Sequence, residues 1–229
     1  MKNRSGTSRS PFPGLLASAA ALISSGTALA AGAPIEPYLM ASQQDEIALA
    51  RTAAPPSIAG HATVLVLGKR GYITAVKGTN GFVCFVTRSW DNETNSKSAV
   101  FWNPRFRAPF CYNAPGARSL LPGYLTRTRW VIAGASQKEI AARDRTAWAA
   151  GKFPRPAPGA ICYMMSKLGD LGGGPWHPHV MFYFPEGQTP SWGANLKGVP
   201  IMAGTGHHNT VFFVELPYWS DGTPDSGKE

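Results

Sequence analysis

The most apolar short run of the chain is Val180–Phe184, in which every residue is aliphatic, aromatic or methionine. Prolines flank this run, and an apolar stretch of that length between turn-forming residues predicts a buried central strand. If the extended backbone reaches back to His177, the period of two places His177, His179 and Met181 on one face of the strand. These three side chains would form a row able to bind a metal ion or to make hydrogen bonds.

Further strands are predicted where β-branched and aromatic residues cluster between glycine- or proline-bearing connections. These segments are Ala62–Leu67, Tyr72–Val76, Gly81–Thr87, Thr126–Ala133, Ala160–Met165, Val199–Ala203 and Thr210–Leu216. The short glycine-bearing connections between the first three segments predict an antiparallel meander. Residues 88–123 lack periodicity, and their isolated aromatic side chains predict an irregular segment that is pinned onto the body of the protein.

Two patterns of the capping-box type predict helices. Ser42, followed three residues later by Asp45, begins a short amphipathic helix that ends before a proline pair. Ser136 and Glu139 begin a second helix, which runs through Ala150. Together these elements predict an α+β fold, a single domain built on a mainly antiparallel sheet of about six to eight strands with two covering helices.

Residues 1–30 have the pattern of an export signal, with a basic start, an apolar middle and a small-residue cleavage site. In this interpretation residues 31–41 are a flexible lead-in and residues 42–229 are the single globular domain. No later apolar run is long enough to cross a bilayer as a helix. The protein is therefore expected in the periplasm or outside the cell, and the sequence leaves its oligomeric state open.

The chain carries 22 basic and 13 acidic residues, a net charge of +9, and removal of the export signal with its three basic residues leaves 19 minus 13, or +6, which favours an anionic partner. Residues 94–138 contain no acidic residue, and in this segment Arg105, Arg107, Arg127 and Arg129 are candidates for binding an anion. On the predicted strand, Arg127 and Arg129 would share one face and together could bind a phosphate, sulfate or carboxylate group. The alternative is a solvated basic face. A nucleic acid is not expected as the partner of an exported protein without a recognition motif.

Three cysteines, Cys84, Cys111 and Cys162, allow one disulfide in an oxidising compartment, and their number does not choose the pair. The apolar neighbours of Cys162 predict a buried, inert thiol, and the alternative is a catalytic nucleophile. Glu215, at the end of an apolar run, is either a general base with a raised pKa or a solvated side chain at a strand end. Phosphate-binding loops, zinc-protease helices and serine-hydrolase elbows have no counterpart in the sequence.

Five short motifs follow one another in order along the chain beyond the export signal. They are Ala62-Thr63-Val64, the segment Gly78–Cys84, Pro109-Phe110-Cys111, the segment Cys162–Met165 and the segment Pro178–Met181. In these motifs the chain resembles a family of exported, largely uncharacterised bacterial proteins. The resemblance implies that Cys84 and Cys111 form the disulfide, since both lie inside resembling motifs, and it implies no activity.

The histidines are the candidates for a metal site, with His179 and His208 on different segments and His177 completing the set; copper or zinc is the expected ion. The alternative makes His179 a hydrogen-bonded core residue. The sequence therefore predicts a non-catalytic binding or structural protein of the cell envelope that takes a metal ion or an anionic ligand. The alternative function is a hydrolase-type enzyme that uses a histidine with Glu215 or Cys162.

Overall fold

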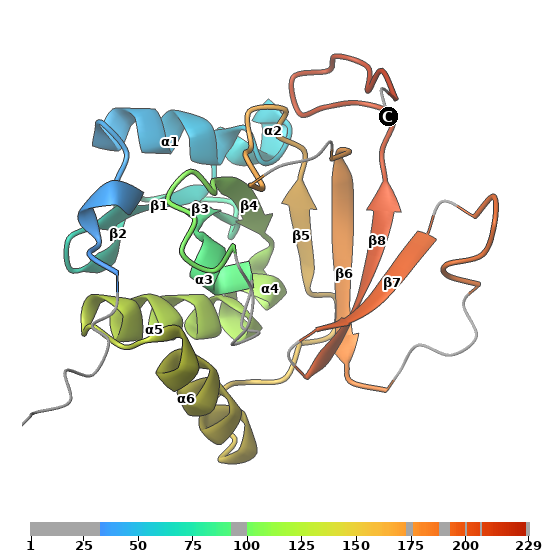
Figure 1. Ribbon diagram of the computed structural model, residues 1–229. Coiled ribbons are helices and arrows are strands. Elements are labelled where there is room, and N and C mark those ends of the chain that lie inside the picture. Colours follow the sequence, from blue (N-terminus) through green and yellow to red (C-terminus); the bar gives the residue numbers. More distant parts are fainter. Residues whose placement is uncertain are drawn as a thin grey trace, which may run out of the picture.

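The structure is a computed structural model. In the part of the chain that it describes, one sheet of eight strands forms the framework (Figure 1). That part comprises residues 33–92, 100–172, 176–187, 193–199, 201–206 and 208–227, so the expected export signal lies outside it. The strands are β1 (Thr63–Gly68), β2 (Gly71–Val76), β3 (Val83–Thr87), β4 (Ala108–Tyr112), β5 (Ile161–Met164), β6 (His179–Pro185), β7 (Ile201–Gly206) and β8 (Asn209–Glu215). The helices are η1 (Glu36–Tyr38), α1 (Gln43–Arg51), α2 (Pro56–Ala59), α3 (Ser89–Asn92), α4 (Ala114–Ser119), α5 (Leu121–Ile132) and α6 (Gln137–Ala149).

The order of the strands across the sheet is β2-β1-β3-β4-β5-β6-β8-β7. All neighbouring strands are antiparallel except β1 and β3, which are parallel. The prediction of a single α+β domain on a mainly antiparallel sheet is therefore confirmed. The predicted meander is wrong, because β3 returns to pair with β1 rather than with β2. The number of covering helices also exceeds the expected two.

Helices lie on both faces of the half of the sheet that contains β1, β3 and β4 (Figure 1). On one face, α1 and α2 pack their small and aliphatic side chains on a cluster that includes Val64, Val86 and both bridged cysteines. On the other face, residues from α4 and α5 pack against Phe85 and Tyr112. Because consecutive side chains of a strand point to opposite faces, the same strands supply both clusters.

The apolar run that the sequence singles out is β6, with β5 on one side and β8 on the other. His179, Met181 and Tyr183 share the face toward the helical layer, as the period of two predicts. The strand was expected to be buried on both faces. Phe182, on the opposite face, is 37% exposed, so that face is only partly buried.

The predicted strand at 126–133 is wrong, because these residues belong to the helix α5. Buried positions in this helix include Arg127, Thr128 and Val131, and Val131 follows the other two by four and three residues, the spacing of one side of a helix. The helix begins upstream of the predicted segment, with Pro122 in its first turn, where a proline is tolerated.

Residues 88–123 are more regular than their composition predicts, since they contain α3, β4 and α4. The fully buried strand β4 pairs with β3 and β5 near the middle of the sheet. Its Pro109 sits opposite Val86 in the register, and a proline inside a run argues against a central strand. The segment is also rich in Asn, Ser and Arg, and this composition together with its prolines predicted an irregular segment instead of a strand.

Within the expected lead-in, residues 31–41, the side chains of Ile35 and Tyr38 are buried. Tyr38 in η1 is 2% exposed, and its ring lies 4.6 Å from that of Trp90. The two predicted helix starts are confirmed. Ser42 Oγ accepts a hydrogen bond from the Asp45 amide, and Ser136 forms a complete capping box with Glu139.

A disulfide joins Cys84 on β3 to Cys111 on β4, and Cys162 is a buried free thiol. The two bridged residues are direct partners in the antiparallel register. The bridge lies under α1, and the chain between the bridged residues includes residues 88–110 of the segment that was expected to be irregular.

Replacing Cys84 and Cys111 together with Ala is expected to lower the free energy of unfolding by about 3–4 kcal/mol, because the bridged residues are 27 positions apart and the cross-link restricts the unfolded chain. Denaturant unfolding with and without the bridge measures the loss, and Cys162→Ala is the control that leaves the cross-link intact. Peptide mapping without reduction should recover Cys84 linked to Cys111. A linked peptide that contains Cys162 would contradict the assignment.

Candidate functional site

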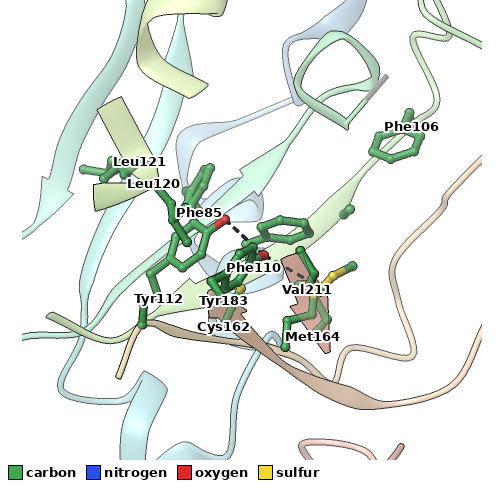
Figure 2. Packing of buried hydrophobic residues seen from close by; sticks show 14 residues of the cluster. Phe85, Phe106, Phe110, Tyr112, Leu120, Leu121, Cys162, Met164, Tyr183 and Val211 are labelled. Atoms are coloured by element: carbon green, nitrogen blue, oxygen red, sulfur yellow. Dashed lines mark hydrogen bonds between the residues drawn. The ribbon is translucent and has the colours of Figure 1, made fainter. Parts of the chain in front are cut away.

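A cavity of about 420 Å³ lies between the sheet and the layer formed by α3 to α6. Strands β4, β5, β6 and β8 line one side, and residues of α3, α4, α5 and α6 line the other. Figure 2 shows part of this wall, with Phe110, Tyr112, Met164, Tyr183 and Val211 gathered around one region. The volume is within the range of about 300–1,000 Å³ that small-molecule sites occupy in proteins.

The walls of the cavity are mainly aromatic and sulfur-containing. The hydroxyl groups of Tyr112 and Tyr183 lie 3.4 Å apart, and the Tyr183 hydroxyl donates a hydrogen bond to Met181 Sδ over 3.3 Å (Figure 2). Burial raises the pKa of Tyr112, Tyr124 and Tyr183 above the ordinary value, so these phenols stay protonated. The cavity therefore offers neutral aromatic surface to whatever occupies it.

Arg127 enters the wall from α5 as a paired charge. Its Nε donates a hydrogen bond to Asp144 Oδ1 of α6 over 2.8 Å, and the two residues are 4% and 3% exposed. The guanidinium carbon also lies 5.7 Å from the centre of the Tyr124 ring. A buried arginine with its own carboxylate is already neutralised, so it is a weak anchor for an anion.

The structure does not gather the four predicted anion-binding arginines. Arg129 is two positions from Arg127 on a helix, which turns the two side chains to different sides, and Arg129 is exposed and donates to Thr126 Oγ1. Arg105 is exposed beside Asp170. Arg107 donates to two backbone carbonyls, and burial lowers its pKa to about 10. The strand face on which Arg127 and Arg129 were expected to cooperate does not exist.

Asp91 in α3 is a buried carboxylate that sequence reasoning missed. It is 2% exposed, and its Oδ2 accepts a hydrogen bond from the Arg88 amide over 3.2 Å. Its Oδ1 is buried and has no hydrogen-bond partner, and the residue lines the cavity. Burial raises the pKa of Asp91 to about 7, against the opposing influence of Arg127 and Arg88.

His179 lines the cavity from β6 as a neutral imidazole. Its Nδ1 lies 2.8 Å from the His177 carbonyl oxygen, and a carbonyl only accepts, so Nδ1 carries the proton. Nε2 is consequently an acceptor, and it is buried without a partner. Burial lowers the pKa of His179, which favours this neutral form near pH 7.

Asn209 and Trp148 also line the cavity, and each has a buried polar atom without a hydrogen-bond partner, Oδ1 and Nε1 respectively. Asn209 is opposite Pro185 in the register, whereas His179 is opposite Glu215. Six positions of β6 therefore separate the two ends, roughly 20 Å at the usual rise of a strand. The cavity accordingly follows β6 and β8 lengthwise.

The same register separates the predicted metal ligands. His179 and His208 lie at opposite ends of the β6–β8 pair, His177 Nδ1 contacts Asp225 Oδ2 at 2.6 Å, and His208 faces Glu186 at 3.6 Å. No group of three His, Cys, Asp or Glu side chains suited to a metal ion occurs in the described ranges, and His207 lies outside them. His177, His179 and His208 are thus not brought together as one site.

The two groups considered for hydrolysis have unsuitable surroundings. Cys162 is fully buried, and burial raises the pKa of its thiol, whereas a nucleophilic cysteine needs a lowered pKa and access. Glu215 is exposed at the end of β8, in register with His179 but with no hydrogen bond between the two side chains among those found.

Comparison of the chain with protein-family models, with curated proteins and with solved structures finds no match. The resemblance carried by the short sequence motifs stays a prediction. No helix in the described ranges has the length and apolar character needed to cross a membrane. The geometry of the cavity is therefore the basis for inferring a function.

Arg127→Ala is expected to lower the free energy of unfolding by about 3–5 kcal/mol, because it leaves the buried Asp144 carboxylate without its counter-charge. Arg129→Ala, in the same helix but exposed, is the matched control and should change it by less than about 0.5 kcal/mol. Denaturant unfolding measures both values. Equal effects of the two substitutions would contradict the buried ion pair.

Asp91→Asn is expected to remove a pH dependence of stability. The pKa of Asp91 is about 7 in the folded state against 3.8 ordinarily, so the folded state binds the extra proton and wild-type stability falls as the pH rises from about 4 to about 7. A shift of that size corresponds to about 4 kcal/mol. Unfolding curves across this range should show a shallower decline for the variant. Parallel curves for the two proteins would contradict the raised pKa.

Proposed function

We propose that the protein is an exported, non-catalytic binding protein that holds a small, largely apolar molecule in the cavity between β4, β5, β6 and β8 and the helices. The observation that carries the proposal is the combination of a cavity of about 420 Å³ with aromatic walls and a few unpartnered polar atoms. Such a combination is typical of ligand sites, because buried polar atoms without partners are costly in the free protein.

The chemistry of the walls supports binding rather than catalysis. The tyrosines that line the cavity are protonated and neutral, Arg127 is paired with Asp144, and Cys162 is not among the lining residues. A hydrolase would need an activated nucleophile or a base in contact with a proton to be removed. The lining offers His179 and Asp91 as acceptors, which suits recognition of a ligand by hydrogen bonds.

Export is supported by the sequence pattern of residues 1–30 and by the Cys84–Cys111 disulfide, which is compatible with an oxidising compartment. A periplasmic or secreted location would expose the protein to small apolar molecules that enter through the envelope. An anionic ligand, the expectation from net charge, is less well supported, because the arginine in the cavity already has a carboxylate partner.

Filling the cavity tests the proposal. Val211 lines the cavity and Val214, three residues on in β8, faces the other side of the sheet, so Val211→Phe and Val214→Phe form a matched pair. The uncharged fluorescent probe N-phenylnaphthylamine should bind the wild type saturably. Val211→Phe should weaken binding by about tenfold or more, and Val214→Phe by less than about twofold, since only the former fills the cavity.

Circular dichroism and thermal unfolding of both variants establish that each is folded before binding is compared. A probe that does not bind the wild type, or that binds folded Val211→Phe as well as the wild type, would contradict the cavity as a ligand site.

A further inference from the structure

Five ionisable side chains are buried in the described part of the chain, and the acidic ones outnumber the basic ones by one. The acids are Glu46, Asp91 and Asp144, and the bases are Arg88 and Arg127. Arg88 pairs with Glu46 at 2.9 Å, and Arg127 pairs with Asp144 at 2.8 Å. Asp91 is the remaining acid, and an ionised carboxylate buried without a counter-charge is strongly unfavourable.

The groups around Asp91 do not supply the missing charge. Arg88 precedes α3 and gives Asp91 only its backbone amide, while its guanidinium is used by Glu46 and two carbonyls. Arg127 and Tyr124 face Asp91 from α5. Tyr72 faces it from β2; its hydroxyl donates to the Val86 carbonyl over 2.6 Å and also lies near enough to Asp91 to lower the pKa of that carboxyl, without supplying a charge. Arg127 forms its ion pair with Asp144, and both tyrosines are neutral. Asp91 is among the residues that line the cavity, so an occupant of the cavity is the partner considered for it.

The other unpartnered atoms of the cavity favour the same kind of ligand. His179 Nε2 and Asn209 Oδ1 are acceptors, like Asp91 Oδ1, and Trp148 Nε1 is the one donor among these four. A donor group on a ligand would suit any one of these acceptors, although His179 and Asn209 are too far apart along β6 for one small ligand to reach both. The aromatic walls also suit a positive charge, because the faces of tyrosine, tryptophan and phenylalanine rings attract cations.

We propose that the cavity takes a small apolar amine, whose protonated nitrogen pairs with Asp91 Oδ1 while its hydrocarbon part lies against the aromatic walls. This inference rests on the proposed binding function and specifies its ligand class. A neutral donor would satisfy the oxygen without balancing the charge. An anion would add a further negative charge to a region in which buried acids already outnumber buried arginines.

Competition between three ligands of nearly the same shape tests the inference. Phenethylamine, phenethyl alcohol and hydrocinnamate carry an ammonium, a hydroxyl and a carboxylate on the same phenylalkyl frame, and each is titrated against bound N-phenylnaphthylamine at pH 8. The amine is expected to bind the wild type about tenfold or more tighter than the alcohol, and the carboxylate is expected to bind most weakly.

Asp91→Asn should bring the amine to within about twofold of the alcohol, because the amide has the shape of the carboxylate without its charge. Asp170→Asn, at a half-exposed carboxylate outside the cavity lining, is the matched control and should leave the preference for the amine unchanged. In the wild type the preference should also shrink as the pH falls from 8 to 6. The proton then competes with the ammonium for Asp91, whose pKa is about 7 in the free protein.

Equal binding of amine and alcohol to the wild type at pH 8 would overturn the amine inference while leaving the cavity as a site for apolar molecules. Preference for the amine that persists in folded Asp91→Asn would also overturn it, by assigning the recognition to another group. Failure of N-phenylnaphthylamine itself to bind would instead contradict the proposed function. The comparison of ligands on the wild type decides the question even where the variant fails to fold.

Discussion

The fully buried guanidinium of Arg88 is the contact on which the assembly of the N-terminal half depends. It donates to Glu46 Oε1 and to the carbonyl oxygens of Tyr38 and Val86, and Glu46 Oε1 also accepts the amide hydrogen of Leu67. These partners come from η1, α1, β1 and β3. An arginine buried without them would cost several kcal/mol, so the four elements are stable only when they are assembled around it.

The same residue connects the framework to the cavity. The Arg88 amide donates to Asp91 and so holds the first turn of α3, and the neighbouring Trp90 donates from its indole to Thr128 Oγ1 of α5. From α5, the ion pair between Arg127 and Asp144 holds α6 in turn. Successive polar contacts, from Arg88 to α3, from α3 to α5 and from α5 to α6, therefore position the helical wall of the cavity. The hydrogen bonds of the sheet position the opposite wall. This arrangement lets aromatic side chains line a space without filling it.

Local signals predicted much of the fold, because they need no knowledge of distant residues. The caps at Ser42 and Ser136 and the alternation along β6 are examples, and each is confirmed. Non-local contacts account for the errors. β4 tolerates Pro109 because its pairing with β3 and β5 outweighs the local preference, and α5 is a helix because one of its sides is buried against the sheet and α6.

The candidate site shows the same division between local and distant information. Strand periodicity placed His179 on the correct face of β6. The partner of Arg127 is Asp144, 17 residues away, and no sequence pattern predicts that pairing. The sequence does not predict Asp91 as a site residue, because a lone acidic residue after a strand is normally solvated. Its burial without a counter-charge is not explained by the packing of the free protein. Each other buried charge is satisfied by a partner of opposite sign, whereas Asp91, in the lining of an aromatic cavity, has none, and the free energy that this costs the free protein is what an occupant of the proposed class would relieve.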